Sequence, residues 1–215
     1  MVRIVVFSDR DGTINKDENY FLGSDPNWKE QVSFLKGVVE GIKLINSIPS
    51  SHFFILTNQS GVALKGGAFD NLTLDRMHEV TKFIIQELEK QGAKVDNYFA
   101  CPFVDNKYVE KAKKKGRQLN PEFVKDNHPD LKPNPEMIKK ALKSLNRSEK
   151  NCKIFMIGDR ASDVEMGINA GGTGILIESY KTHELGDKEK VEKINGDKYV
   201  AKDFLDAAKY ITDLV

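Results

Sequence analysis

The sequence predicts an α/β fold, a doubly wound parallel sheet with helices on both faces. Two observations predict it. Short apolar runs typical of buried strands alternate along the chain with segments of helical periodicity, and several of these runs end in polar or acidic residues, as expected where parallel strands end at a ligand-binding edge. The chain has 215 residues, enough for one sizeable core, and we expect a single domain over residues 1–215.

The first half of the chain predicts two strands and two helices. Residues 3–7 and 53–56 are apolar runs typical of buried strands, and residues 38–45 between them repeat apolar side chains at helical spacing. A clearer helix follows Thr73, a possible N-cap, and ends before Gly92, a typical stop residue. The apolar stripe of this helix is formed by Leu74, Met77, Val80, Ile84 and Leu88.

The second half predicts three more strands and three more helices. One helix begins near residue 134, because Asn134 can cap it and Pro135 suits a first turn. The other expected elements are strands at residues 97–100, 153–157 and 174–177 and helices at residues 164–170 and 204–214. Strands that alternate with helices in this way favour a parallel sheet over an antiparallel one.

Two polar segments interrupt this alternation, and we interpret both as insertions. Residues 16–36 contain Pro26 and the only tryptophan, Trp28. Residues 103–131 carry seven lysines and arginines and five acidic residues. Neither segment has room for a helical lid domain, so we expect a minimal cap and an open site.

Composition excludes several classes of protein. The net charge of +1 provides no global field to attract nucleic acid or an anionic membrane. The N-terminal apolar run is too short for a signal peptide or a membrane span, so we expect a cytoplasmic protein without a membrane partner. We interpret Cys101 and Cys152 as packed thiols rather than a disulfide pair. Nothing in the sequence indicates an oligomeric state.

The candidate chemical groups follow the predicted strands. Asp9 and Asp11 lie in "DRDGT", Thr57 begins "TNQSG", and Asp159 lies in "GDRASD". Because the carboxyl ends of parallel strands share one edge of a sheet, we expect these side chains to converge there, joined by Lys132 from beyond the second insertion.

This set of groups suits phosphoryl transfer from a monoester. An ionised carboxylate can attack phosphorus once a Mg²⁺ ion bound by oxygen ligands offsets the repulsion, so we assign Asp9 as nucleophile and metal ligand. Asp11 lies two residues further along an extended backbone, on the same side, and can act as acid and then as base. Gly12 allows the chain to turn directly after it.

The remaining polar residues complete this predicted site. Thr57 and Asn58 can bind phosphoryl oxygens, and Lys132 can balance the charge of the transition state. Asp159 would complete the metal site, with Asp163 supporting the ligands from behind. Asp163 has an alternative interpretation as the cap of the helix from residue 164.

The four motifs resemble those of the haloacid dehalogenase superfamily of phosphatases, in the same order and at similar spacing. They are "DRDGT", "TNQSG", the Lys-Pro pair at residues 132–133 and "GDRASD". Together with Tyr20, Cys101-Pro102 and "KPNPEM", they are similar to the branch of D,D-heptose 1,7-bisphosphate 7-phosphatases and histidinol-phosphate phosphatases. The resemblance implies a HAD-like fold and a Mg²⁺-dependent aspartyl-phosphate mechanism, in which Asp11 also gives its backbone carbonyl to the metal.

The resemblance also places substrate contacts after the nucleophile and after the second strand. The candidate substrate-binding residues are Arg10, Asp17, Glu18, Asn19, Tyr20, Gln59 and Ser60. We expect a small phosphorylated metabolite there, such as heptose 1,7-bisphosphate, another sugar phosphate or histidinol phosphate.

The chain departs from this branch at two places. The branch has a zinc loop of the form Cys-x-His and Cys-x-Cys, whereas Phe103 follows Cys101-Pro102 and the only later cysteine is Cys152, so we expect no zinc. We expect apolar packing to order this loop instead, with Tyr108, Leu119 and Phe123 as candidates. Leu131 stands where the branch has an arginine, which predicts weaker discrimination among substrates.

Two alternative functions remain open. The cationic run "KAKKKGR" at residues 111–117 would suit a polynucleotide 3′-phosphatase, although the neutral net charge counts against nucleic acid. A non-catalytic phosphate-binding protein of the same fold is the other alternative. A binding protein has no need of an acid two residues after a nucleophile, which counts against it.

Overall fold

The computed structural model describes residues 3–17 and 21–215, and only the backbone of residues 180–181. The main sheet contains β1 (Arg3–Ser8), β2 (His52–Asn58), β4 (Asn97–Cys101), β6 (Cys152–Gly158), β7 (Thr173–Ile177) and β8 (Lys198–Ala201). Its strand order is β4-β2-β1-β6-β7-β8, and every neighbouring pair is parallel. The predicted α/β fold is therefore confirmed.

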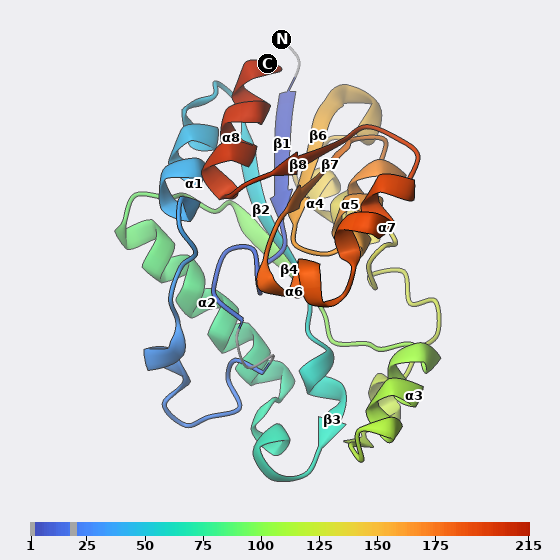
Figure 1. The fold of residues 1–215 in the computed structure, drawn as a ribbon. Helices are drawn as coiled ribbons and strands as arrows, with labels where there is room; N and C mark the ends of the chain where they lie inside the picture. The colour runs from blue at the N-terminus through green and yellow to red at the C-terminus, as the bar shows by residue number, and fades with distance from the viewer. Residues whose placement is uncertain (1–2, 18–20) are drawn as a thin grey trace.

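Helices cover both faces of this sheet (Figure 1). One face packs against α1 (Val38–Ser47), α2 (Leu74–Lys90) and α8 (Phe204–Asp213), and the other packs against α4 (Glu136–Ser144) and α5 (Ala161–Asn169). The short helices α6 (Tyr180–Glu184) and α7 (Asp187–Lys193) follow β7, and α7 lies against α5. Among the described residues, no helix is long and apolar enough to cross a membrane.

The central strand β1 shows why this region of the chain is so apolar. Ile4 and Val6 point into the core on the α1 side, whereas Val5 and Phe7 point into the core on the α4 side. Successive side chains of a strand point to opposite faces, so a strand covered on both sides is buried at every position. This burial leaves the carboxyl end of β1 as the first place where polar residues can stand.

Of the two N-caps predicted from the sequence, one is confirmed and the other is wrong. Thr73 caps α2 as predicted, since its side chain accepts a hydrogen bond from the backbone N–H of Arg76 at 3.1 Å. The cap prediction for Asn134 is wrong, because Pro135 occupies the N-cap position of α4 and the Asn134 side chain donates to the carbonyl of His128 instead.

Four elements near the C-terminus differ from the prediction: one begins earlier than expected and three were not predicted. The helix expected at residues 164–170 begins three residues earlier, at Ala161, directly after the acidic motif. The sequence analysis also missed β8 and the α6–α7 pair, whose sequences are rich in lysine and acidic residues. They form because tertiary packing against β7 and α5 outweighs weak local preferences.

The insertion at residues 103–131 contains α3 (Asn106–Lys114) and β5 (Gln118–Leu119), which pairs with β3 (Leu64–Lys65) beyond the carboxyl ends of the sheet strands (Figure 1). Phe103 orders its base, because its ring lies 4.1 Å from the ring of His128 and 6.1 Å from that of Phe123. Of the three candidates for apolar packing, Phe123 contacts the Phe103 ring as expected, whereas Leu119 is held by backbone pairing with Leu64 and Tyr108 lines the cavity described below.

Residues 16–36 are anchored to the body by Trp28. Its side chain is 2% exposed, and its ring meets that of Phe83 in α2 edge to face at 5.3 Å. Backbone hydrogen bonds from Lys16 to Ser33 and from Leu35 to Ile14 close the base of this loop. The described part of this polar segment is therefore held by a buried aromatic side chain together with backbone hydrogen bonds at its base.

Trp28→Ala should lower the free energy of unfolding by about 3–5 kcal/mol, because it removes a buried aromatic side chain and leaves a cavity. Trp28→Phe retains part of the packing against Phe83 and should cost less than half as much. Urea denaturation followed by circular dichroism measures both changes. Equal and small losses in the two variants would show that Trp28 does not anchor the loop.

Candidate active site

The turn after β1 brings the first acidic residues to the edge of the sheet. The backbone N–H of Asp9 donates to the carbonyl of Ile157 at 2.8 Å, which continues the pairing of β1 with β6. Gly12 has a φ of +88°, and a Cβ there would lie 2.4 Å from an Asp159 carboxylate oxygen. Only glycine allows this turn and this close approach together.

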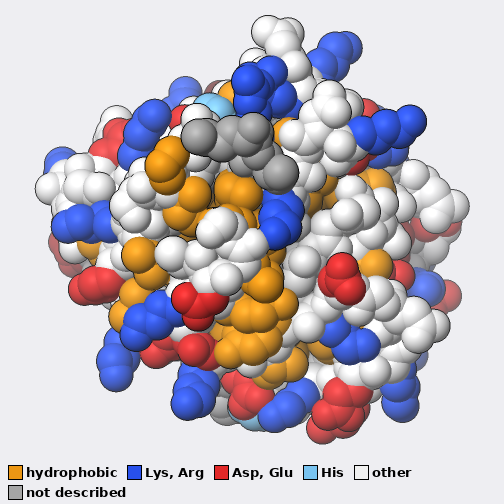
Figure 2. Space-filling view, turned by 90° about the horizontal axis from the view of Figure 1, so that it is seen from above, with side chains coloured by type: hydrophobic (Ala, Val, Ile, Leu, Met, Phe, Trp, Pro, Cys, Tyr) orange, Lys and Arg blue, Asp and Glu red, His pale blue; other side chains and the backbone are white. Residues whose placement is uncertain are grey.

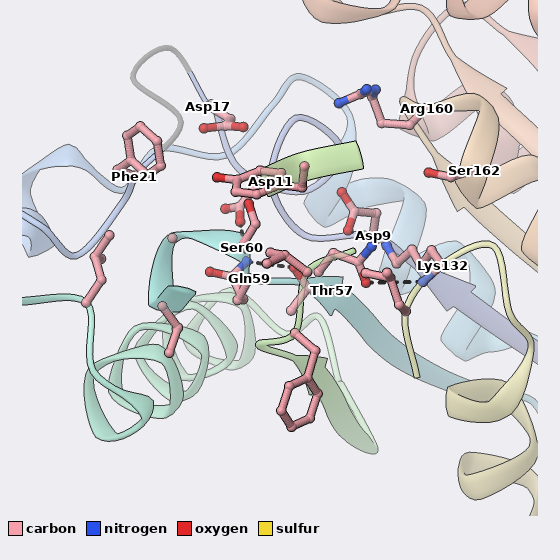
Figure 3. A pocket seen from close by; sticks show the side chains of 18 of the residues that line it. Asp9, Asp11, Asp17, Phe21, Thr57, Gln59, Ser60, Lys132, Arg160 and Ser162 are labelled. Carbon is pink, nitrogen blue, oxygen red and sulfur yellow. Dashed lines mark hydrogen bonds and ion pairs between the residues drawn. The ribbon is translucent and has the colours of Figure 1, made fainter. Parts of the chain in front are cut away.

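Three buried carboxylates meet at this edge. Asp9, Asp159 and Asp163 each offer an oxygen within 4.8 Å of the others. The Lys132 ammonium lies among them, 2.6 Å from Asp9 Oδ1 and 2.8 Å from Asp163 Oδ1, and it points toward Asp9 in Figure 3. The predicted convergence of carboxylates and lysine is what the structure contains.

The hydrogen bonds distinguish the two carboxylates contributed by the motif "GDRASD". Both oxygens of Asp163 are occupied, Oδ1 by Lys132 and Oδ2 by the backbone N–H of Arg160. Asp159 Oδ2 accepts from the Ser179 hydroxyl at 2.9 Å, but the buried Oδ1 has no hydrogen-bond partner among the described residues. A buried oxygen without a donor fits a cation ligand, so Asp9 and Asp159 suit a metal ion and Asp163 suits a supporting role.

The crowding of carboxylates shifts their pKa values. Burial, with smaller contributions from Asp163 and Asp11, raises the pKa of Asp9 to about 6 although Lys132 opposes the shift. Burial and the nearby Asp9 and Asp163 also raise the pKa of Asp159 well above its usual range. For Lys132, burial alone would lower the pKa, but the ion pairs with Asp163 and Asp9 outweigh it and raise the pKa. A bound cation would relieve the repulsion that these carboxylate shifts reflect.

Asp11 lies in a separate clasp of donors. Its Oδ1 accepts from Arg10 Nε and from the Asn15 amide at 3.0 Å each, and its Oδ2 accepts from Arg10 at 2.6 Å and from the Gln59 amide at 2.7 Å. Burial would raise the pKa of this carboxyl, but the Arg10 guanidinium and the hydrogen bonds outweigh it and lower the pKa. Asp11 is therefore held as a carboxylate.

Arg10, which we expected to contact substrate, is placed otherwise. Its side chain is 1% exposed and does not line the cavity described below. Besides Asp11, the guanidinium donates to Thr81 Oγ1 at 2.7 Å and to Gln59 Oε1 at 2.9 Å. These contacts suit a residue that orients Asp11 rather than one that binds a ligand.

A cavity of about 540 Å³ opens over these groups. The predicted site residues that line it are Asp9, Asp11, Asp17, Thr57, Asn58, Gln59, Ser60, Lys132, Asp159 and Asp163. The predicted contacts Glu18, Asn19 and Tyr20 lie outside the described residues. Thr57 is buried beside Asp9, and its hydroxyl accepts from the Gln59 amide at 2.8 Å. The Asn58 side-chain oxygen accepts from the backbone N–H of Lys132 at 3.4 Å.

Sequence reasoning missed residues that position Asp159. The Thr182 hydroxyl donates to the Asp159 backbone carbonyl at 2.7 Å, and Ser179 donates to its side chain. Arg160 lines the cavity and is held by Asp187 at 2.6 Å (Figure 3). Arg160 lies inside "GDRASD" and could have been noticed, whereas Ser179 and Thr182 follow β7 without a recognisable motif.

The cysteines lie too far apart to share a metal ion. Cys101 ends β4 and Cys152 begins β6, and β2 and β1 lie between these strands. With about 4.8 Å between neighbouring strands, the three lateral steps alone separate them by about 14 Å, and they also lie at opposite ends of their strands, whereas zinc binds sulfur at about 2.3 Å. Both cysteines are free, as expected. The absence of zinc from the protein stays a prediction.

Known proteins resemble this chain in sequence and in fold. Residues 131–207 match a family model described as HAD-hydrolase-like. A D-glycero-beta-D-manno-heptose-1,7-bisphosphate 7-phosphatase from Rhodopseudomonas palustris is 33% identical over 180 residues, which cover 82% of this chain and 84% of that protein. A D-glycero-alpha-D-manno-heptose-1,7-bisphosphate 7-phosphatase from Photorhabdus laumondii is 29% identical, with 78% of each chain covered.

A solved structure shares the fold over nearly the whole chain. It is the D,D-heptose 1,7-bisphosphate phosphatase of B. bronchiseptica, complexed with magnesium and phosphate. The TM-score is 0.73 at 18% identity, and 99% of each chain is covered.

The metal-free protein should lose stability as pH rises from about 4 to about 6. Because the pKa of Asp9 is raised to about 6 and that of Asp159 is also raised, the folded state binds protons more tightly than the unfolded chain in this range. Asp159→Asn removes one of the repelling charges, and at pH 7 it should stabilise the metal-free protein by on the order of 1 kcal/mol. Thermal unfolding in chelator at pH 4.5 and pH 7 measures this.

Asp213→Asn, the same change at an exposed position, is the matched control and should leave the unfolding temperature unchanged at both pH values. If Asp159→Asn destabilises the protein equally at the two pH values, then carboxylate repulsion does not govern this site.

Proposed function

Because the chain belongs to the HAD-like hydrolases, the haloacid dehalogenase superfamily, and is a phosphatase of phosphoric monoesters, we propose that it removes the 7-phosphate from a D-glycero-D-manno-heptose 1,7-bisphosphate. The observation that carries the proposal is the contact between Asp9 and Lys132 at the floor of the cavity, beside the open oxygen of Asp159. The proposed nucleophile, an ammonium for the phosphoryl oxygens and a carboxylate oxygen suited to a cation all face the same cavity.

In the proposed reaction Asp9 attacks phosphorus and the bond from phosphorus to the sugar oxygen breaks, which leaves an aspartyl-phosphate. Lys132 and the Thr57 hydroxyl bind the phosphoryl oxygens and balance their charge. A Mg²⁺ ion held by Asp9, Asp159 and the Asp11 backbone carbonyl would offset the negative charge of nucleophile and phosphate. Water then attacks phosphorus, and the bond from Asp9 to phosphorus breaks.

Asp11 carries the proton in both steps of this proposal. It gives a proton to the departing sugar oxygen and later takes one from the attacking water. The clasp of Arg10, Gln59 and Asn15 favours the ionised form, which is the base. To act as an acid, the Asp11 carboxyl has to leave Arg10 and turn toward the substrate, where the neighbouring phosphate favours its protonated form.

Heptose bisphosphate is preferred over the other expected metabolite because the relatives described above are named for it and none of them is named for histidinol phosphate. The cavity walls contribute polar groups suited to a polyol, among them Asp17, Asn58, Ser60 and Ser162. A volume of about 540 Å³ can enclose a small phosphorylated sugar.

The alternatives are weaker. Figure 2 looks onto the end of the molecule where both termini lie, and there lysines and arginines are interspersed with acidic side chains, around a strip of hydrophobic ones. The cavity lies at the opposite end, where the strands end (Figure 1), and the net charge of +1 counts against a polynucleotide there. A non-catalytic role would leave the clasp around Asp11 without a purpose, because binding phosphate needs no oriented carboxylate.

Asp9→Asn should reduce hydrolysis of an aryl phosphate by at least about a thousandfold, because it removes the nucleophile while keeping the shape of the side chain. Excess chelator should reduce wild-type turnover similarly, and millimolar Mg²⁺ should restore it and raise the unfolding temperature of the wild type but not of Asp159→Asn. Steady-state kinetics and thermal unfolding measure these effects.

Asp213→Asn serves as the control with unchanged turnover. Activity of Asp9→Asn within a few-fold of wild type would exclude Asp9 as nucleophile, and undiminished turnover in chelator would exclude the metal.

Heptose 1,7-bisphosphate should be hydrolysed with a higher kcat/KM than histidinol phosphate or simple sugar monophosphates, with some activity on each. Leu131 lines the cavity and offers no donor. Leu131→Arg should raise the preference for the bisphosphate by roughly tenfold or more, since a charged hydrogen bond contributes about 1.5–3 kcal/mol. Leu131→Met is the matched uncharged control. A 3′-phosphorylated oligonucleotide cleaved far faster than every metabolite would overturn the proposed substrate.

A further inference from the structure

The cavity has basic side chains that the proposed reaction does not use. Lys111 and Lys115 line it from the α3 segment, together with Arg117 just beyond the helix. Residues four apart lie on one face of a helix, so Lys111 and Lys115 face the cavity together, whereas Lys113 does not line it. The insertion at residues 103–131 therefore gives the cavity a second group of positive charges.

The backbone of Arg117 is fixed from both sides. Two residues beyond α3, Gly116 has a φ of +67°, in the left-handed region, and the backbone N–H of Arg117 then donates to the carbonyl of Ala112 at 3.0 Å. The next residues, Gln118 and Leu119, pair with β3. Arg117 is thus held between a helix end and a small sheet.

Its side chain is oriented as well. The guanidinium carbon lies 4.9 Å from the centre of the Phe21 ring and 5.6 Å from that of Phe69. The centres of the Phe21 and Phe69 rings lie 4.8 Å apart, and the two rings form a T-shaped, edge-to-face pair. Stacking on aromatic rings fixes the plane of a guanidinium while its N–H groups stay available to an anion.

Arg117 lies toward the end of the cavity that is away from Lys132, because it stacks on Phe21. Figure 3 shows Phe21, its stacking partner, on the side of the cavity near Asp17 and away from Lys132 and Arg160. Lys132 neutralises Asp9 and Asp163, whereas none of Lys111, Lys115 and Arg117 forms an ion pair with a carboxylate in the part of the chain that the structure describes. These three basic side chains are therefore not engaged in ion pairs within the described residues, and Asp17 is the acidic side chain that Figure 3 shows at the same end of the cavity.

We propose that Arg117, with Lys111 and Lys115, forms a subsite for a second phosphate group at the far end of the substrate. The inference rests on the proposed function in that one phosphate reacts at Asp9 while the other is bound at Arg117. A planar guanidinium can bind two oxygens of a phosphate at once, and the two lysines add charge at the rim. Arg117 thereby supplies, from another wall of the cavity, the donor that Leu131 lacks.

The test compares doubly and singly phosphorylated sugars in the wild type and in Arg117→Gln. Hydrolysis of heptose 1,7-bisphosphate and heptose 7-phosphate gives one pair of kcat/KM values. Inhibition of aryl phosphate hydrolysis by fructose 1,6-bisphosphate and fructose 6-phosphate gives a second pair. Arg117→Gln should lower kcat/KM for heptose 1,7-bisphosphate, and raise the inhibition constant of fructose 1,6-bisphosphate, by roughly tenfold to a hundredfold. The corresponding values for the monophosphates and the aryl phosphate should change by less than about threefold.

Variants on the same helix supply the controls. Lys113→Gln removes an equal charge outside the cavity and should leave every substrate unchanged, while Arg117→Lys should retain part of the preference for bisphosphates. Lys111→Gln together with Lys115→Gln should weaken the binding of bisphosphates, and this loss should be smaller at high salt, where charges are screened. An unfolding temperature close to wild type excludes loss of folding as the cause.

The outcomes separate this subsite from the proposed function. If the wild type prefers another doubly phosphorylated compound to heptose bisphosphate and Arg117→Gln removes that preference, the subsite stands and the proposed substrate is wrong. Suppose instead that the wild type hydrolyses heptose bisphosphate well. If Arg117→Gln then lowers kcat/KM equally for mono- and bisphosphates, or changes it for neither, the subsite is wrong and the proposed function stands.

Discussion

The buried ion pairs of Lys132 are the interaction on which the site depends. Three carboxylates approach one another at the ends of β1 and β6, where burial makes their charges costly. One ammonium contacts two of them, Asp9 and Asp163, and so permits the strands to end in acidic residues at all. Asp163 in turn binds the backbone of Arg160 and fixes the start of α5, which links the charge balance to the fold.

The two aspartates of "DRDGT" differ in the number of hydrogen-bond donors around them. Asp9 has one strong partner, Lys132, and its pKa is raised, whereas Asp11 has four donors around it and its pKa is lowered. Two carboxylates two residues apart are thus placed in opposite electrostatic environments. In the proposed reaction, a bound cation would keep Asp9 ionised, and the Asp11 carboxyl would have to leave Arg10 before it could give up a proton. Arg10 produces the difference, because it is buried beside one of them only.

The insertion at residues 103–131 forms an ordered wall of the cavity. Contacts of Phe103 with His128 and Phe123 hold the base of this loop. Pairing of β5 with β3 holds its tip over the cavity and fixes Arg117 between them. A loop ordered by packing can vary its charged residues without losing its shape, which suits a wall that selects among phosphorylated sugars.

The sequence by itself determined the alternation of elements and the acidic motifs, since buried strands must be apolar at every position and polar residues can appear only where they end. It therefore indicated Asp9, Asp11, Thr57, Lys132 and Asp159, although their roles stay predictions. Only the tertiary structure decided that Arg10 serves Asp11, that Ser179 and Thr182 position Asp159, and that β8 completes the sheet. These features depend on contacts between residues far apart in the chain. A local sequence pattern cannot predict which donor will meet which acceptor once the chain has folded.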